Sequence, residues 1–147
     1  MTITEEKAKA LAEFLKVSKE ELTEGVCYDN SICYDNQEYL VLTDDEADQR
    51  AKEEILESLW AFNADFIIDH CKNVNNMSTW EYQAAIESLR KAQADQCENL
   101  NGLVFALIDD IDEFVDDAIT SDGRGHFISR YDGEENEEGD FFIYRVD

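Results

Sequence analysis

The residues best suited to catalysis or ligand binding lie in the run Asp122-Gly123-Arg124-Gly125-His126. An imidazole close to a guanidinium could bind phosphate or take part in acid–base catalysis. A lone histidine at the start of a strand is more often structural, for instance hydrogen-bonded to Asp122. The chain also contains no GxGxxG, P-loop, GxSxG or HExxH motif, so the common nucleotide-dependent and hydrolytic mechanisms have no support. We therefore expect a protein that is not an enzyme.

A zinc site is the next candidate, because cysteine and histidine are the usual ligands of zinc. The four cysteines are scattered, with His70 beside the third of them: Cys27, Cys33, Cys71 and Cys97. The Cys-x5-Cys spacing of the first two is unusual for zinc, and there is no close CxxC pair. We therefore expect free, mostly buried thiols, no metal and no cofactor.

The loop at residues 132–140 resembles a calcium-binding loop, because acidic or amide side chains occupy its alternate positions. An EF-hand requires glycine at the sixth position, where this chain has Glu137. The sequence therefore predicts an acidic hairpin loop without a specific calcium ion.

The most unusual property of the chain is its charge. Its 147 residues include 36 Asp and Glu but only 12 Lys and Arg, which gives a formal net charge of -24. A compact domain of this length is about 38 Å across and so carries about 0.6 net charges per ångström. B-form DNA also carries about 0.6 charges per ångström of its axis. Such a surface repels nucleic acids and anionic membranes, and it attracts proteins with grooves lined by Lys and Arg.

The acidic side chains gather on predicted helix faces and in the C-terminal loop. The candidate partner-binding residues are Asp109, Asp112, Glu113, Asp116, Asp117, Glu53, Glu57, Asp65, Glu134, Glu135, Glu137 and Glu138. Acids four residues apart on a helix lie about 6 Å apart along its axis, which is comparable to the spacing of phosphates along a strand. A solvated helix face or a halophilic surface would explain the same acids, and both interpretations stay open beside mimicry.

The helices that would position these acids follow from the apolar periodicity. The pattern predicts one long helix over residues 43–70, which Thr43 and Glu46 begin with a capping box. Its apolar stripe recurs every three or four residues, at Ala47, Ala51, Ile55, Leu59, Phe62 and Phe66. Another helix is predicted over residues 103–119, and it contains no basic residue.

Capping boxes predict further helices over residues 2–16, 18–25 and 78–99. Trp60 and Trp80 lie on predicted helices, where packing in the core is more common than stacking on a ligand. We therefore expect both tryptophans to be core residues.

Short β-prone runs separated by turn residues lie at residues 26–28, 32–34 and 39–42. Two further strands, at residues 126–131 and 141–146, predict a C-terminal hairpin around the acidic loop, which could join the 39–42 strand. The expected fold is therefore α+β: a mostly helical single domain over residues 1–147, with a small antiparallel sheet that includes the C-terminal hairpin.

Several runs of the sequence stand out together. They are Tyr39-Leu40-Val41-Leu42-Thr43-Asp44-Asp45-Glu46-Ala47-Asp48, Ser58-Leu59-Trp60-Ala61-Phe62-Asn63, Asp122-Gly123-Arg124-Gly125-His126, Ser129-Arg130-Tyr131-Asp132-Gly133-Glu134-Glu135-Asn136-Glu137 and Ile143-Tyr144-Arg145. With these runs the chain resembles small acidic proteins encoded by phages and mobile elements, which implies a mobile-element source and no particular activity. The charge balance is separately similar to that of phage DNA-mimic antirestriction and anti-CRISPR proteins.

The leading hypothesis is a non-enzymatic inhibitor of a host nucleic-acid-binding defence protein, either a CRISPR effector or a restriction enzyme. Its carboxylates would occupy the basic groove of that protein in place of phosphates, without direct binding of nucleic acid. The alternative is an acidic adaptor or regulatory protein that binds a partner through the hairpin aromatics Phe127, Tyr131, Phe141 and Tyr144. No apolar stretch is long enough to span a membrane and no signal peptide is evident, so we expect a location in the cytoplasm of a bacterial host. The sequence leaves the oligomeric state open.

Overall fold

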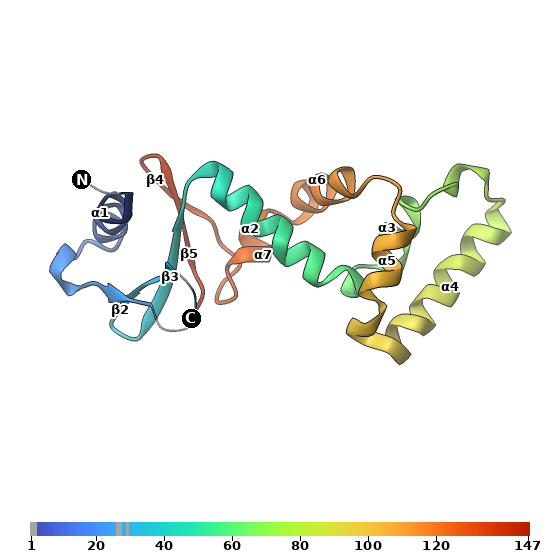
Figure 1. The fold of residues 1–147 in the computed structure, drawn as a ribbon, viewed down its shortest axis with the longest axis horizontal. Helices are drawn as coiled ribbons and strands as arrows, with labels where there is room; N and C mark the ends of the chain where they lie inside the picture. The colour runs from blue at the N-terminus through green and yellow to red at the C-terminus, as the bar shows by residue number, and fades with distance from the viewer. Residues whose placement is uncertain (1–2, 26–27, 29) are drawn as a thin grey trace. The chain divides into compact units, whose positions relative to one another are not determined.

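A computed structural model describes residues 3–25, 28 and 30–147, and its strands form one antiparallel sheet in the order β1-β2-β3-β5-β4 (Figure 1). The strands are β1 (Thr23–Glu24), β2 (Ile32–Tyr34), β3 (Gln37–Leu42), β4 (Asn136–Glu138) and β5 (Phe141–Arg145). β3 pairs with β5, with Leu40 opposite Tyr144 and Val41 opposite Ile143. The α+β class is confirmed, and so is the pairing of the 39–42 strand with a C-terminal strand.

Helices make up most of the remaining chain. They are α1 (Ile3–Leu15), α2 (Asp44–Glu57), α3 (Ala64–Asp69), α4 (Thr79–Gln96), α5 (Asn101–Leu107), α6 (Ile111–Asp122) and α7 (Arg124–Ile128), with the 3₁₀ turns η1 (Lys19–Glu21), η2 (Leu59–Ala61), η3 (Val74–Asn76) and η4 (Cys97–Leu100). Within the described ranges, none of these helices combines the length and the apolar character that crossing a membrane requires.

Residue contacts divide the chain into two compact units. Unit 1 comprises Met1–Ala51 and Asp122–Asp147, and unit 2 comprises Lys52–Ser121, so the boundary falls within the sequence of α2. The single domain expected over residues 1–147 remains a prediction.

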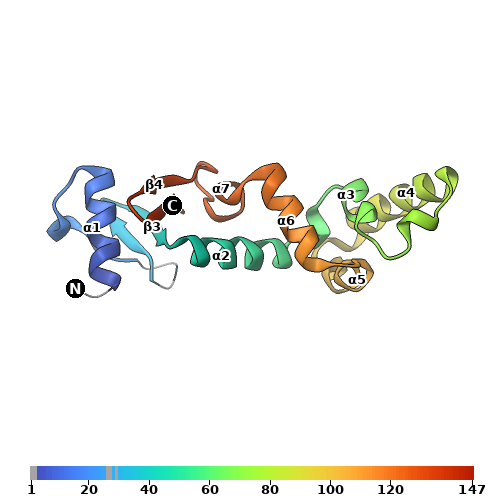
Figure 2. The ribbon, with the colours of Figure 1, turned by 90° about the horizontal axis from the view of Figure 1, so that it is seen from above.

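Unit 1 is built on the period-2 alternation of β3 and β5. Tyr39, Val41 and Ile143 form a buried cluster with Ala10 and Leu11 of α1, which packs on that side of the sheet (Figure 2). The next residues along the two strands, Leu40 and Tyr144, are buried as well, at 2% and 0% exposure. Both faces of the central strand pair are therefore covered, which explains why the runs at residues 39–42 and 141–146 are so apolar.

The N-terminal part of the chain follows the predicted caps with one exception. Helix 2–16 corresponds to α1, although the expected cap at Thr2 lies outside the described residues. Glu21 accepts the Ser18 N–H at 3.0 Å, but the turn ends at Glu21 rather than at Gly25. The chain continues instead into the edge strand β1, because Thr23 and Glu24 pair with β2. Residues 26, 27 and 29 of the expected 26–28 strand and its turn lie outside the described residues.

The strand predicted over residues 126–131 is wrong, because α7 occupies most of this segment. Gly125 and Ile128 are the buried residues of α7, and a spacing of three places both on one side of a helical turn. The true hairpin is β4–β5, in which Glu138 pairs with Phe141 across the turn Gly139-Asp140. Gly139 has φ +62, a conformation that glycine adopts without strain. Part of the expected acidic loop is therefore strand β4.

The long helix predicted over residues 43–70 is also wrong as one element. Its beginning is confirmed, since the Thr43 N–H donates to Glu46 Oε1 at 2.9 Å and the Glu46 N–H donates to Thr43 Oγ1 at 3.3 Å. The helix ends at Glu57, and the chain turns through η2 before α3 begins. The buried stripe nevertheless persists, because Ala47, Ala51 and Ile55 are fully buried.

Side chains distant in sequence stabilise this turn. Asn101 Nδ2 donates to the carbonyls of Leu56 (3.2 Å) and Glu57 (2.7 Å), while its Oδ1 accepts the Trp60 N–H at 2.8 Å. Gln93 Nε2 donates to the carbonyls of Trp60 (2.8 Å) and Phe62 (2.6 Å). These bonds satisfy backbone groups that a continuing helix would have paired internally.

The helix predicted over residues 103–119 is two helices as well. Asp110 Oδ1 accepts the N–H groups of Asp112 (3.1 Å) and Glu113 (3.2 Å), which begins α6 after a break.

The helix at 78–99 is confirmed as α4 with its capping box. Trp80 is 78% exposed, so the core role expected for it is wrong: the buried residues Ile86 and Leu89 lie on the other side of α4.

We predict that Asn101→Ala destabilises unit 2 by about 2 kcal/mol, because it leaves three backbone groups without their partner. Both tryptophans lie in unit 2, so tryptophan fluorescence during urea unfolding reports on this unit. Asn99→Ala, on the exposed side of η4, is the matched control and should leave the midpoint unchanged. Equal midpoints for the two variants would contradict the role of Asn101.

Candidate functional site

The predicted partner-binding acids fall in both units. Glu134, Glu135, Glu137 and Glu138 belong to unit 1. The eight acids in unit 2 are Glu53, Glu57, Asp65, Asp109, Asp112, Glu113, Asp116 and Asp117, and all eight are exposed. Unit 2 therefore carries most of the predicted acidic surface.

Helix α6 presents the densest group of these acids. Phe114, Val115 and Ala118 face the core, while Asp112, Glu113, Asp116 and Asp117 are exposed. Asp112 and Asp116, like Glu113 and Asp117, are four residues apart, so each pair stands about 6 Å apart along the helix axis. The first two acids also lie at the positive end of the helix dipole, which stabilises them there.

A polar hollow lies beside α6 within unit 2. Its acidic lining consists of Asp69, Asp109, Asp110, Glu113 and Asp117. The Asp109 N–H donates to the carbonyl of His70 at 2.9 Å, which brings the break before α6 against the end of α3. The sequence pattern did not single out Asp69 and Asp110, because a continuous helix over residues 103–119 places Asp110 in mid-helix. Asp110, an aspartate directly before the apolar Ile111, is the signal in the sequence that could have predicted a helix N-cap here.

Lys52 of α2 and His70, which follows α3, pair with two of the α6 acids. Lys52 Nζ lies 3.0 Å from Asp112 Oδ1, and His70 Nε2 lies 2.8 Å from Asp117 Oδ2. Asp109, Glu113 and Asp116 are exposed and have no ion-pair partner in the part of the chain that the structure describes, although the charge of His70 also acts on Glu113.

His70 joins this acidic surface to the core of unit 2. Its ring packs against Phe66 and Phe114, with ring centroids 4.7 and 5.1 Å away. Its Nδ1 lies 2.9 Å from the carbonyl oxygen of Phe66. With a carbonyl facing one nitrogen and the Asp117 carboxylate facing the other, both nitrogens must be protonated to donate both bonds, so the geometry favours the imidazolium ion.

The pKa of His70 is raised from its ordinary value near 6.5. Partial burial opposes the charged ring, but the hydrogen bonds to Phe66 and Asp117 and the charges of Asp117 and Glu113 outweigh it. His70 was considered from sequence only as a zinc ligand beside Cys71, whereas both of its ring nitrogens have partners within the chain.

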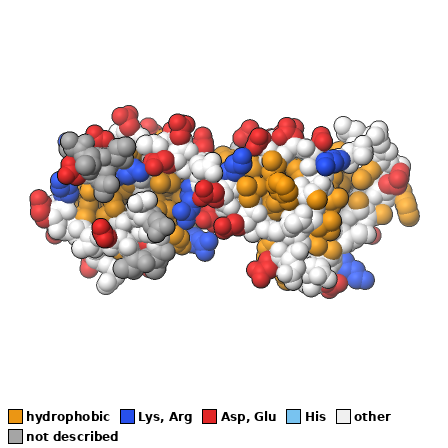
Figure 3. All heavy atoms as spheres, in the orientation of Figure 1, with side chains coloured by type: hydrophobic (Ala, Val, Ile, Leu, Met, Phe, Trp, Pro, Cys, Tyr) orange, Lys and Arg blue, Asp and Glu red, His pale blue; other side chains and the backbone are white. Residues whose placement is uncertain are grey.

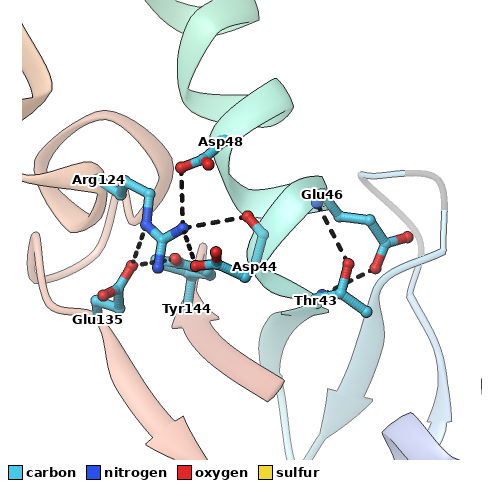
Figure 4. A network of polar contacts seen from close by, with 7 residues as sticks. All are labelled: Thr43, Asp44, Glu46, Asp48, Arg124, Glu135 and Tyr144. Atoms are coloured by element: carbon cyan, nitrogen blue, oxygen red, sulfur yellow. Dashed lines mark hydrogen bonds and ion pairs between the residues drawn. The ribbon is translucent and has the colours of Figure 1, made fainter. Parts of the chain in front are cut away.

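In unit 1, Arg124 binds several of the remaining acids (Figure 4). Its Nη1 lies 2.8 Å from Asp44 Oδ1 and 3.0 Å from Asp48 Oδ1, and its Nε lies 2.8 Å from Glu135 Oε1. The same Glu135 oxygen accepts the hydroxyl of Tyr144. Burial opposes the charge of the guanidinium, but these carboxylates raise the pKa of Arg124.

The Asp122-Gly123-Arg124-Gly125-His126 run is thus explained by the fold. Arg124 is bound by carboxylates, so its guanidinium is already occupied where a phosphate would bind. A Cβ on Gly125 would lie 2.5 Å from the carbonyl oxygen of Gly133, so only glycine fits against that loop. His126 is exposed and packs edge-to-face on Phe127 at 5.0 Å.

The cysteines considered as zinc ligands lie in different units of the chain. Cys27 lies outside the described residues, Cys33 is half-buried in unit 1, and Cys71 is buried in unit 2, where burial raises the pKa of its thiol. Cys97 is exposed, so the expectation of buried thiols fails at that position.

Within the described ranges, one group of carboxylates is close enough to hold a metal ion: Asp44, Asp45 and Asp48. Two of these already bind Arg124.

The hairpin aromatics do not form one exposed surface. Tyr144 is fully buried, and Phe127 and Phe141 are half-buried. Tyr131 is 58% exposed, with the Arg145 guanidinium 3.5 Å above its ring centroid. A partner surface made of all four rings, as the adaptor hypothesis requires, is therefore absent from unit 1 as the structure describes it.

Comparisons with protein-family models, curated proteins and solved structures give no match to this chain. The function must therefore be inferred from the geometry and electrostatics of the chain itself.

We predict that Arg124→Gln destabilises unit 1 by about 2 kcal/mol, since the neutral amide leaves three carboxylates together without their cation. Amide hydrogen exchange at Ile143 and Tyr144 should accelerate, while Arg90→Gln, an exposed site on α4, should leave it unchanged. Arg124→Lys should recover only part of the protection, because an ammonium cannot reproduce the guanidinium fork. Full protection in Arg124→Gln would show that the carboxylates do not need this cation.

We predict that His70 makes unit 2 more stable in mild acid than in mild alkali. A raised folded-state pKa gives stability that is fully present below the unfolded value of about 6.5 and is lost as the pH rises through the folded value. The stability difference between wild type and His70→Asn should therefore be larger at pH 5.5 than at pH 8.5. Comparing the two proteins at each pH cancels the titration of the other acids, and His126→Asn serves as the control. A difference that does not change with pH would contradict a charged His70 pair.

Proposed function

We propose that this protein is a non-enzymatic inhibitor that binds the basic nucleic-acid groove of a host defence protein, such as a CRISPR effector or a restriction enzyme. The observation that carries the proposal is the cluster of Asp109, Glu113 and Asp116, which have no ion-pair partner among the described residues. These carboxylates would take positions that phosphates take in the groove.

The arrangement of charge in unit 2 supports this proposal. The acids on α6 are about 6 Å apart, comparable to successive phosphates, and they are held on a regular helix rather than on a loop. A helix presents its side chains at fixed spacings, so less conformational entropy is lost when they bind than from a disordered acidic tail. The net charge of -24 would also accelerate encounter with a cationic groove and repel competing nucleic acid.

We further propose a phage or mobile element as the source and the bacterial cytoplasm as the place of action, as the sequence resemblance implies. The resemblance includes residues that the fold of unit 1 requires, notably Arg124 and Gly125.

The test is capture of proteins from a bacterial lysate that contains CRISPR effectors and restriction enzymes, followed by elution with salt, DNA or RNA. With the captured target, Asp109→Asn/Glu113→Gln/Asp116→Asn should weaken binding roughly tenfold and flatten its dependence on salt, because each contact contributes at most about 1 kcal/mol.

The matched control is Glu87→Gln/Asp95→Asn/Glu98→Gln, which removes the same charge from exposed positions of α4 and η4 in the same unit. Equal losses in both triple variants would indicate a general charge effect. A target that nucleic acid does not displace would contradict mimicry.

A further inference from the structure

Helix α5 combines an apolar composition with an exposed position. Its seven residues, Asn-Gly-Leu-Val-Phe-Ala-Leu, include no charged side chain. Leu103 and Phe105 are each 53% exposed and Leu107 is 38% exposed, whereas Val104 is fully buried. Figure 3 shows hydrophobic side chains gathered at the surface in the region of α3 and α5. A helix that is apolar on every side is normally buried on every side.

The helical geometry explains which residues are left uncovered. Val104 and Ile108 lie four residues apart on the buried side. Leu103 and Leu107, also four apart, form a row on one flank of the helix. Phe105 lies on the opposite flank, about 160° from Leu103 around the axis, with the small exposed residues Gly102 and Ala106 between them. Substituting these exposed positions with polar residues would not disturb the core, so folding alone does not explain their apolar character.

The charge around α5 indicates what this surface fits. Asp109, Asp110, Asp112 and Glu113 follow directly after the helix in sequence, and three of them line the hollow beside α6. Lys72 is a basic neighbour, since its N–H donates to the carbonyl of Leu107 at 3.0 Å. An apolar helix next to four acids is complementary to a partner that has an apolar stripe beside lysine or arginine. A second copy of the chain would bring like charges together at the same place.

We propose that α5 and the acids that follow it form a docking surface for a basic amphipathic helix of a protein partner. This rests on the proposed function only in requiring a cationic protein as the target. Apolar contact with Leu103, Phe105 and Leu107 provides the salt-resistant part of the affinity, and the acids orient the basic edge of the partner helix. A nucleic-acid mimic that acts through charge alone has no use for such a helix.

The test uses helical peptides of about 14 residues, or four turns, as probes. The first peptide has leucine on one face and lysine and arginine beside it; the second has serine in place of leucine; the third has glutamate in place of the basic residues. Fluorescence anisotropy should show binding of the first peptide and at least tenfold weaker binding of the other two. Binding of the first should persist in about 0.5 M salt, where exposed charges are strongly screened.

The key variant is Leu103→Gln/Phe105→Gln, which should weaken binding of the first peptide at least tenfold. Its circular dichroism and urea midpoint should match wild type, because both side chains are more than half exposed. Trp80→Gln removes an exposed aromatic from α4 in the same unit and should leave peptide binding unchanged.

Three outcomes would overturn the proposal: equal binding of the leucine and serine peptides, no binding of any peptide, or a dimer that Leu103→Gln/Phe105→Gln abolishes. The proposed function fails differently. If the Asp109, Glu113 and Asp116 triple variant releases the captured target and the Leu103 and Phe105 variant does not, mimicry stands and the docking surface is wrong. The reverse result would leave α5 as the main contact and remove mimicry.

Discussion

The structure depends on how a chain with 36 acidic side chains uses only 12 lysines and arginines. Three of these cations form ion pairs between segments that are far apart in sequence. Lys7 binds Glu46, Lys52 binds Asp112, and Arg124 binds Asp44, which is 80 positions away. Because unpaired acids repel one another, each such bond removes a local repulsion and also fixes two elements together. These ion pairs therefore connect elements of the fold that are distant in sequence.

This use of cations separates the acids that are paired within the chain from those that are not. Arg124 occupies carboxylates of unit 1, including Glu135, so that part of the acidic sequence is structural. In unit 2, Lys52 and His70 each pair with one acid of α6, and no cation among the described residues forms an ion pair with Asp109, Glu113 or Asp116. The exposed apolar residues of α5 directly precede these acids in sequence. Contact with both kinds of surface would give a partner affinity from apolar burial and orientation from charge.

Three residues that the sequence offers for catalysis or ligand binding make contacts that stabilise the fold. Arg124 is bound by carboxylates, Gly125 permits a close backbone approach, and His70 bonds a carbonyl and a carboxylate. In Arg124 and His70 a reactive type of side chain satisfies charges or backbone groups of its own chain. A motif in a strongly acidic protein is therefore weak support for catalysis until the partners of its cations are known.

The α+β class, the capping boxes at Thr43 and Ser78, the central strands and the buried stripe through Ile55 are all predictable from the sequence, because local periodicity and short-range hydrogen bonds specify them. The sequence does not show where the long helices end. Helix α2 ends where the side chain of Asn101, from a distant segment, donates hydrogen bonds to its last carbonyls. The sequence also does not show that residues 124–128 are helical, or which acids have cation partners. Each of these points depends on a contact between residues that no sequence window contains together, so it is settled by the folded chain.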